Sequence, residues 1–368
     1  MRQRLGLIIV LSLFLTGCHQ TAIHVPATQP QNFITTSATS DAKSQHLAAF
    51  VAHNFVQKSG VLTSLGGAKV GEDDASGADY LSESMGLWLL HLVQTKQYDE
   101  FRIFYSRAKA KLYNGKNFSY RLTRPNDKRS HVNATADDLR IMRALVAYDE
   151  ATGSTHYRKA VATLYANWAQ GCLPNGQLRD FYDVRYHKAS SQASLAYFDL
   201  QTLRYLGGDT KHYRQLLSVV QHGYLGDAFP MYAASYNWAD VAYSSQNLNT
   251  SEVLETVLQL ARVGKLKVTT KAWLIQRVEK QDLPNAMTTT GAIADANQSV
   301  ANWALVAQIF ATIHDGKHYD QTMALIWAQQ VKAGKLKGGF GNDKTGAAFS
   351  YNNLNVLLAA DLRRQAHE

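Results

Sequence analysis

The chain has 368 residues, of which 46% are hydrophobic, and this is enough to bury a large core in one big domain or two small ones. Six prolines and 24 glycines exclude a fibrous or low-complexity protein. The formal charge of +9 suits an anionic cell surface or a charged glycan. Because the basic residues form no cluster along the chain with a recognition motif, nucleic acid is not an expected partner.

The N-terminal 17 residues have the pattern of a targeting segment. Arg2 and Arg4 precede an apolar stretch at 5–15 that is too short for a membrane span. The run Leu15-Thr16-Gly17-Cys18 resembles the lipobox of bacterial lipoproteins, where cleavage before the cysteine leaves a lipid-modified N-terminus. An ordinary secretory signal is the alternative. We therefore predict a signal peptide at 1–17, lipidation of Cys18, and a location on the outer face of the cell membrane.

Residues 18–42 are rich in Ser, Thr, Gln and Ala and show no hydrophobic periodicity. This composition is typical of a flexible tether between a membrane and a folded domain. The only other cysteine is Cys172, so a lipidated Cys18 leaves no intramolecular disulfide. The stability of the domain that follows, at 43–368, must therefore come from its core.

The domain is predicted to be all-α, because helical apolar periodicity alternates with short polar breaks. Strands are expected only as short extended pieces near 177–187 and 229–243. The expected helices cover 43–57, 80–95, 97–114, 136–152, 154–170, 192–207, 210–224, 250–264, 268–281, 296–314, 317–333 and 350–365.

A weak internal repeat pairs these helices. The second helix of several pairs opens with a polar turn followed by a tyrosine, as at Tyr98, Tyr157, Tyr213 and Tyr319. A chance recurrence of helix–turn–helix punctuation is the alternative. Six sequential helical hairpins favour a closed (α/α)6 toroid, with an open solenoid of helical pairs as the other possibility. We expect the long loops to gather at one end and to be functional, namely 171–191, 225–249 and 334–349.

Glu83 is the strongest candidate for chemistry. Together with Leu87 and Leu90 it lies on one face of an expected helix, at positions i, i+4 and i+7. A carboxylate in line with an apolar stripe is costly to bury as an anion, so its pKa tends to rise, as a general acid requires. An exposed Glu near a helix start, favoured there by the helix dipole, is the alternative.

The run Ser82-Glu83-Ser84-Met85-Gly86 resembles the Ser-Glu-x-x-Gly signature of glycoside hydrolase family 8. This resemblance implies an (α/α)6 barrel, a monomer that uses no cofactor, and inverting hydrolysis of a polysaccharide with Glu83 as the proton donor. The family's usual substrates are β-1,4 glucans, chitosan and xylan. A surface-tethered member could instead trim the cell's own exopolysaccharide or wall glycan.

A second segment, Asn133 to Ile141, resembles the family motif Ala-Ser/Thr-Asp-Ala/Gly-Asp but departs from it. The first Asp position is Ala136, the small residue is Asp137, and Asp138 matches the second Asp. Because the family's first Asp contacts the sugar at the cleavage point, Asp137 or Asp138 is expected to bind sugar here. A capping box between Thr135 and Asp138 is the structural alternative.

Inverting hydrolysis also needs a base, with the two carboxyl groups about 6.5–9.5 Å apart to admit a water molecule. The family places an Asp near the start of the eighth helix. Glu252 lies at the start of the expected helix 250–264, where the helix dipole would keep it ionised, although it could simply form a capping box with Asn249. Asp240, in the preceding loop, is the second candidate for the base.

Aromatic residues near these motifs could stack on sugar rings, and the polar, aromatic stretch 180–183 could form a glycan subsite. The 13 histidines show no metal-ligand spacing, and no Gly-x-Ser-x-Gly occurs, so neither a metal site nor a hydrolase serine is expected. A non-catalytic glycan-binding lipoprotein and a polysaccharide lyase are the alternative functions. The predicted substrate-binding residues, besides Asp137 and Asp138, are Trp88, Asp180, Tyr182, Asp183, Tyr236 and Trp238.

Overall fold

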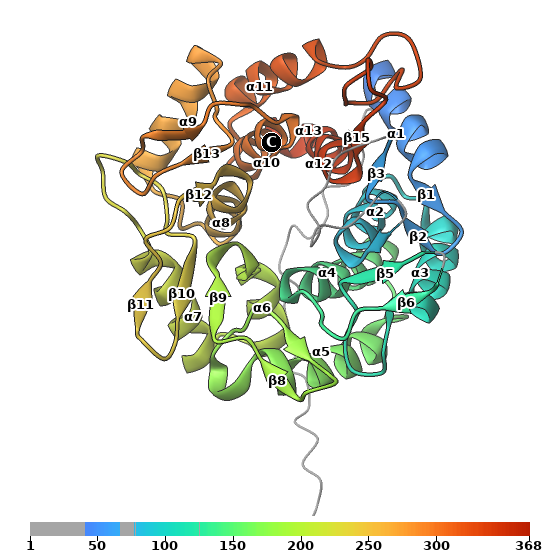
Figure 1. Ribbon diagram of the computed structural model, residues 1–368, viewed down its shortest axis with the longest axis vertical. Helices are drawn as coiled ribbons and strands as arrows, with labels where there is room; N and C mark the ends of the chain where they lie inside the picture. The colour runs from blue at the N-terminus through green and yellow to red at the C-terminus, as the bar shows by residue number, and fades with distance from the viewer. Residues whose placement is uncertain (1–40, 67–76, 78, 125) are drawn as a thin grey trace, which may run out of the picture.

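The computed structural model describes residues 41–66, 77, 79–124 and 126–368. The predicted signal peptide, Cys18 and nearly all of the predicted tether lie outside these residues. Within them, helices surround a central axis in two concentric rings (Figure 1). No helix of this described part combines the length and the apolar character needed to cross a membrane.

Thirteen α-helices occur in the described residues, and the first twelve correspond to the twelve expected from periodicity. They are α1 (Ala42–Asn54), α2 (Ser82–Gln94), α3 (Tyr98–Leu112), α4 (Thr135–Thr152), α5 (Arg158–Cys172), α6 (Leu200–Gly207), α7 (Lys211–His222), α8 (Thr250–Arg262), α9 (Val268–Lys280), α10 (Val300–Thr312), α11 (Gly316–Ala328), α12 (Ser350–Asp361) and α13 (Arg363–Ala366).

The even-numbered helices α2 to α12 form the inner ring, each packed against the next. Helix α12 returns to pack against α2, and α1 covers α12 from outside, so the ring closes (Figure 1). The predicted (α/α)6 toroid is therefore confirmed, and the open solenoid is excluded. The tyrosines of the internal repeat lie at the starts of the outer helices α3, α5, α7 and α11.

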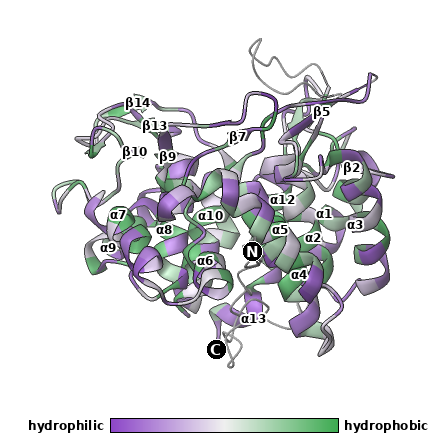
Figure 2. Ribbon diagram, turned by 90° about the horizontal axis from the view of Figure 1, so that it is seen from below, coloured by the Kyte–Doolittle hydropathy of each residue, from purple (hydrophilic) through white to green (hydrophobic). Residues whose placement is uncertain are grey.

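Fifteen short strands in the described residues make six small antiparallel sheets, in the orders β1-β2, β15-β3, β4-β5-β6, β7-β8, β11-β10-β9 and β12-β13-β14. They lie at one end of the toroid, with the C-terminus at the other end (Figure 2). Their bounds are Val56–Gln57, Gly60–Val61, Ser64–Leu65, Tyr80–Leu81, Arg121–Thr123, Lys128–Arg129, Tyr182–Asp183, Lys188–Ala189, Gln192–Ser194, Ser235–Asn237, Ala242–Tyr243, Leu248–Asn249, Ala286–Met287, Ile293–Asp295 and Ala348–Phe349 for β1 to β15.

Most of these strands were not expected, because two or three residues are too few to show a period-2 alternation. Only β7, β10 and β11 fall within the extended pieces predicted near 177–187 and 229–243, and β8 follows the first of these pieces directly. The helix expected at 192–207 begins only at Leu200. The residues before it pair instead with β10 as strand β9 and then form a short 3₁₀ turn at Leu195–Tyr197.

Three inner helices begin directly where a strand ends, since α2 follows β4, α8 follows β12 and α12 follows β15. The strands lie at the same end of the toroid, so the first turns of these three helices also lie at that end (Figure 2). Positive helix dipole ends and backbone N–H groups therefore converge around the axis at this end.

A buried pair helps to close the inner ring at its far end. His91 near the end of α2 lies 2.8 Å, Nδ1 to Oδ2, from Asp361 at the end of α12. Both side chains are almost fully buried, at 3% and 4% exposure. The pair joins the first inner helix to the last, across 270 residues of sequence.

We expect Asp361→Ala to lower the free energy of unfolding by about 3 kcal/mol, because it strands the buried His91 ring nitrogen without its partner. Denaturant titration followed by circular dichroism measures this change. Asp320→Ala is the matched control, since it removes a similar contact to His367 that is 46% and 58% exposed, and it should cost less than about 1 kcal/mol. Equal losses in the two variants would contradict a role for His91 and Asp361 in ring closure.

Candidate active site

A cavity of about 420 Å³ lies where the inner helices begin. Its walls come from the starts of α2, α4, α8 and α12, so it opens at the end of the toroid that carries the strands. Four carboxylates and one arginine supply its ionisable charge, and they are Glu83, Asp137, Glu252, Glu255 and Arg140. Helices α2 and α8 are three places apart in a ring of six and lie on opposite sides of its axis (Figure 1). Glu83 therefore comes to the cavity wall from the side opposite to the two α8 glutamates.

Glu83 occupies the first turn of α2 and is half-buried in the cavity wall. Burial raises its pKa to about 8, and the negative charges of Asp137 and Glu255 add to the effect while Arg140 opposes it. A carboxyl group with this pKa keeps its proton at neutral pH. It can therefore donate that proton to a bound ligand, as a general acid must.

The two neighbouring aspartates of α4 have different surroundings. Asp137 lines the cavity, where it accepts hydrogen bonds from Ser82 Oγ at 2.6 Å and Arg140 Nη1 at 3.1 Å. Asp138 is not part of the cavity wall. It accepts hydrogen bonds from the Phe118 backbone N–H at 2.9 Å and from an Asn133 side chain at 2.6 Å, and so it holds two loop segments to the helix. Of the two, only Asp137 can reach a ligand in the cavity.

The alternative of a capping box at the start of α4 is wrong. The N-cap position is Ala134, which has no side-chain hydrogen bond to offer. The Thr135 hydroxyl instead donates to the Arg179 carbonyl oxygen at 2.6 Å, because the loop after α5 runs beside the start of α4. The helix start is thus held by tertiary contacts, and Asp137 is left free to face the cavity.

Glu252, the preferred candidate for the base, lies in the first turn of α8 and lines the cavity. The Asn249 side chain caps this helix by accepting hydrogen bonds from the backbone N–H groups of Ser251 and Glu252. The Asn249 half of the expected capping box is therefore present. The Glu252 carboxylate has no hydrogen bond or ion pair with any described residue, and partial desolvation raises its pKa. Asp240 lies exposed in the turn between β10 and β11, outside the cavity wall.

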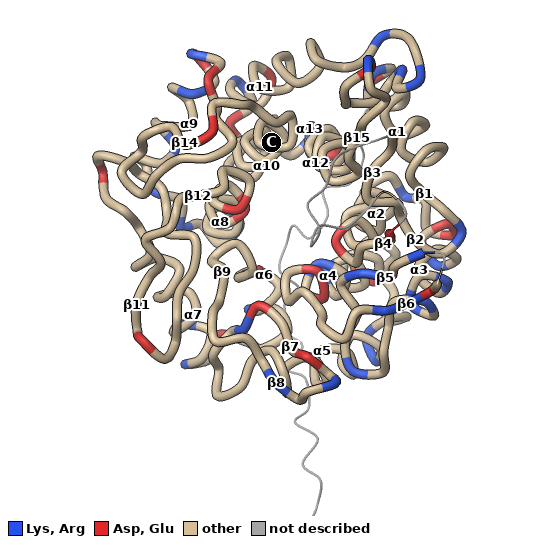
Figure 3. The backbone as a smooth tube through the Cα atoms, viewed as in Figure 1, with Lys and Arg blue, Asp and Glu red and all other residues tan. Residues whose placement is uncertain are grey.

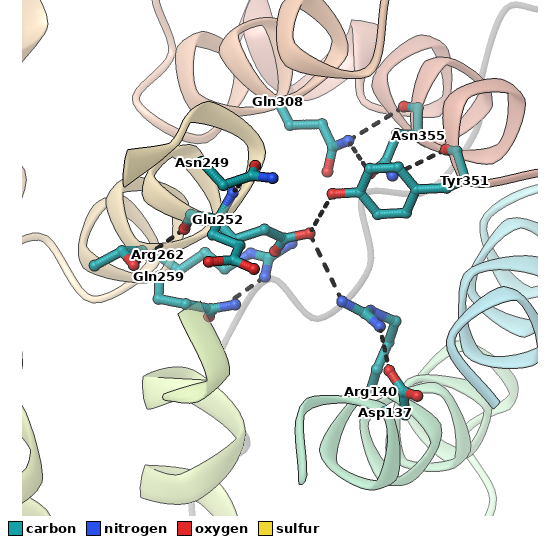
Figure 4. A network of polar contacts seen from close by, with 11 residues as sticks. Asp137, Arg140, Asn249, Glu252, Gln259, Arg262, Gln308, Tyr351 and Asn355 are labelled. Carbon is teal, nitrogen blue, oxygen red and sulfur yellow. Dashed lines mark hydrogen bonds and ion pairs between the residues drawn. The ribbon is translucent and has the colours of Figure 1, made fainter. Parts of the chain in front are cut away.

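Glu255, one turn after Glu252, was missed from the sequence. It lies 3.7 Å from Arg140 Nη2 and accepts a hydrogen bond from the Tyr351 hydroxyl at 3.5 Å. Figure 4 labels these two partners, Arg140 and Tyr351, on either side of the cavity. Arg140 in turn contacts Asp137, so one guanidinium bridges carboxylates on α4 and α8. The spacing of Glu252 and Glu255, at i and i+3, could have indicated a shared helix face. No sequence signal pointed to Tyr351, which comes from the last inner helix.

Gly86, the last residue of the Ser-Glu-x-x-Gly run, has a packing role. A Cβ atom there would lie 3.1 Å from Arg140 Cγ and 3.2 Å from its Cδ, closer than ordinary contact. The aliphatic part of the Arg140 side chain therefore crosses α2 at Gly86, where the helix has no side chain. The glycine of the motif makes room for the arginine that bridges the cavity.

The predicted aromatic stacking residues do not form the cavity wall. Trp88 is 4% exposed and packs against the His91 ring, and Trp238 donates its indole N–H to the Leu178 carbonyl oxygen at 2.7 Å. Tyr236 is likewise buried, while Lys116 covers the ring of Tyr182 at 4.4 Å. The aromatic rings in the wall are those of Tyr120, Tyr197 and Tyr351.

The two aspartates of the 180–183 stretch hold loops in place. Asp180 accepts a hydrogen bond from the Ser194 backbone N–H at 2.6 Å, and burial raises its pKa to about 6. Asp183 accepts from the N–H groups of Arg185 and Tyr186 in the β7–β8 turn. Neither lines the cavity. Among the described residues, no group of His, Cys, Asp and Glu side chains is arranged to hold a metal ion.

No family model and no curated protein matches the chain. Its structure is similar to that of an α-amylase from Clostridium perfringens, with a TM-score of 0.79 and 24% identity over 87% of this chain and 97% of that one. It is also similar to PssZ from Listeria monocytogenes, with a TM-score of 0.67 and 19% identity over 88% and 96%. An endoglucanase from Klebsiella pneumoniae, described as a family 8 glycosyl hydrolase, matches with a TM-score of 0.60 and 14% identity over 88% and 100%. The toroid expected from the resemblance to family 8 is thus the fold of these proteins.

We expect the Glu83 carboxyl group to titrate near pH 8. An infrared difference spectrum between the wild type and Glu83→Gln should contain a protonated-carboxyl band that disappears as the pH passes through this value. Asp137→Asn removes a neighbouring negative charge, so the band should disappear at a lower pH.

In Arg140→Gln, the protonated-carboxyl band of Glu83 should disappear at a higher pH than in the wild type, because the arginine charge lowers the pKa of Glu83. Loss of the band below pH 5 in the wild type would show that Glu83 is an ordinary exposed carboxylate. Shifts of the same sign in the Asp137 and Arg140 variants would contradict the charge arrangement described for the cavity.

Proposed function

We propose that this protein is an inverting glycoside hydrolase of the family 8 type that cleaves a polysaccharide internally. The observation that carries the proposal is one cavity lined both by Glu83 of α2, whose pKa burial raises to about 8, and by Glu252 of α8, whose carboxylate has no partner among the described residues. The fold shared with an α-amylase and an endoglucanase supports it, together with the Ser-Glu-x-x-Gly run around Glu83.

In the proposed reaction, Glu83 gives its proton to the glycosidic oxygen as the bond from that oxygen to the anomeric carbon breaks. A water molecule attacks the same carbon from the opposite face, and Glu252 accepts its proton. One water molecule is consumed and the anomeric configuration inverts. Asp137, held by Ser82 and Arg140, is placed to accept a hydrogen bond from a hydroxyl group of the sugar at the cleavage point.

Glu252 suits the base better than Glu255 does. A base needs a carboxylate that is free to bind water, and Glu255 is already engaged by Arg140 and Tyr351. Asp240 is disfavoured because it lies outside the cavity wall. A lyase uses cationic groups to neutralise a uronate, whereas the described residues of the cavity wall supply one arginine and four carboxylates. The sugar at the cleavage point is therefore uncharged.

The substrate class is a glucan or a related neutral-backbone polysaccharide. Both an α-amylase and endoglucanases share the fold, so a test panel needs α-linked and β-linked glucans, xylan and the producing cell's own exopolysaccharide. The TM-score is 0.79 to the α-amylase and 0.60 to the Klebsiella endoglucanase, so α-glucans are the first substrates to test.

With the polysaccharide that is hydrolysed, Glu83→Gln should lower kcat by about 10² to 10⁴-fold, because the leaving oxygen then departs without a proton. Reducing-end release measures this loss. In the wild type, kcat/KM should fall as the pH rises above about 8, where Glu83 loses its proton. Equal rates for the wild type and Glu83→Gln would rule out Glu83 as the acid.

Glu252→Gln should lower kcat to a similar degree, and azide should partly restore turnover by replacing the activated water as nucleophile, with release of an inverted glycosyl azide. Glu255→Gln is the matched control from the same helix. It should respond to azide no more than the wild type does. If azide restored Glu255→Gln and not Glu252→Gln, the base would be Glu255.

We also propose that the chain is anchored to the outer face of the cell membrane through Cys18. The lipobox-like run before Cys18 and the polar stretch that follows it support the proposal. In the producing cell, Cys18→Ala should move the protein from the membrane fraction to the soluble fraction. Recovery of the wild type entirely in the soluble fraction would contradict the proposed anchor.

A further inference from the structure

Two segments of the chain, 111–134 and 181–190, have a strong excess of basic over acidic residues. These segments carry eight Lys and Arg residues against two Asp, so the charge is +6, compared with +9 for the whole chain. The cations, which we call the cationic rim, are Lys111, Lys116, Arg121, Arg124, Lys128, Arg129, Arg185 and Lys188. No cluster was evident along the sequence, because about fifty residues separate the two segments.

The two segments lie side by side in the fold. Val184 donates its N–H to the His131 carbonyl oxygen at 3.0 Å, and Val132 forms an antiparallel bridge with Asp183. The β5–β6 and β7–β8 hairpins thereby become neighbours at the strand end of the toroid (Figure 3). The two hairpins and their connections form one cationic surface.

The cationic rim borders the wall of the cavity. Strand β5 pairs with β4, with Arg121 opposite Leu81, two residues before Glu83. Leu81 and Tyr120 both line the cavity. A polymer that leaves the cavity past β4 and β5 therefore lies beside the cationic rim.

The loops on the opposite side of the cavity mouth lack such an excess of cations. The segments 225–249 and 282–299, which contain β10 to β14, have no Lys or Arg. They contain four acidic residues, which are Asp227, Asp240, Asp282 and Asp295, and Asp282 pairs with Arg277 of α9 at 3.1 Å. The cavity between the two sides is itself acidic, so the excess of basic residues in the cationic rim lies on one side of the mouth (Figure 3).

We propose that the cationic rim binds anionic substituents on the glycan, carried by sugars that lie on the α2–α4 side of the cleavage point. This inference rests on the proposed function and specifies its substrate. The sugar at the cleavage point is neutral, because the cavity is acidic, whereas sugars further along carry phosphate, sulfate or carboxylate groups. The cations of the rim, on one side of the mouth only, set the direction in which the chain lies.

The test is a binding measurement on full-length protein carrying Glu83→Gln, so that the result does not depend on turnover. The probe is a carboxymethylated glucan, compared with its uncharged parent glucan. Arg124→Ser/Lys128→Ser/Arg185→Ser removes three exposed cations of the rim. Lys332→Ser/Lys335→Ser/Lys337→Ser removes three exposed cations after α11 and lowers the net charge equally.

At low salt, the rim variant should bind the carboxymethylated glucan at least about tenfold more weakly, while the control variant should stay within about twofold. Added salt should reduce the difference, since screening weakens exposed charges. Binding of the uncharged parent should be the same in all three proteins. Equal weakening in both variants, or no preference for the carboxymethylated glucan, would overturn the proposal.

Sulfated and phosphorylated glucans, used in the same measurement, identify which anionic group the rim prefers. Vesicles of phosphatidylglycerol test the membrane as the partner. If the rim variant loses vesicle binding but keeps glucan binding, the rim is a membrane contact and the proposal is wrong. The wild type could prefer the carboxymethylated glucan, and the rim variant lose that preference, while the wild type hydrolyses no glycan. In that case the proposed hydrolase activity is wrong and the proposed anionic glycan site is supported.

Discussion

Closure of the inner ring is the constraint on which the rest of the structure depends. Because α12 packs against α2, six helices surround one axis and their starts are held at a common end. Short strands precede several of these helices and fix where each one begins. Residues of the first helical turns, far apart in sequence, therefore share one cavity, and positive helix dipole ends support the negative charge gathered there.

Burial and the crowding of carboxylates together raise the pKa of Glu83. Ionising an acidic group in a partly desolvated cavity costs free energy, and the negative charges of Asp137 and Glu255 add to that cost. Arg140 opposes them, and it also contacts Asp137 and Glu255. The acid character proposed for Glu83 thus depends on the whole cluster. Gly86 contributes by leaving space for the Arg140 stem.

In the proposed function, the acidic cavity and the cationic rim divide recognition of the glycan between two surfaces. The carboxylates of the cavity would favour a neutral sugar at the cleavage point and carry out proton transfer there. Away from it, the β5–β6 and β7–β8 hairpins can attract negative groups without raising the charge that the reaction must tolerate. The two surfaces meet at the β4–β5 pairing, one turn from Glu83.

The amino-acid sequence by itself determined the twelve longest helices, because a 3.6-residue apolar period survives without tertiary context. Short motifs at helix starts pointed to Glu83, to Asp137 or Asp138, and to Glu252, with Asp240 in a loop as the alternative to Glu252. The sequence could not show most of the two- and three-residue strands, which have no period of their own. Only the tertiary structure decided that Trp88 packs in the core, that Asp138 holds loops while Asp137 faces the cavity, and that Glu255 and Tyr351 join the site. It also brought the basic residues together. The physical reason is that charge and burial depend on distance in space, and ring closure sets those distances between residues that the chain keeps far apart.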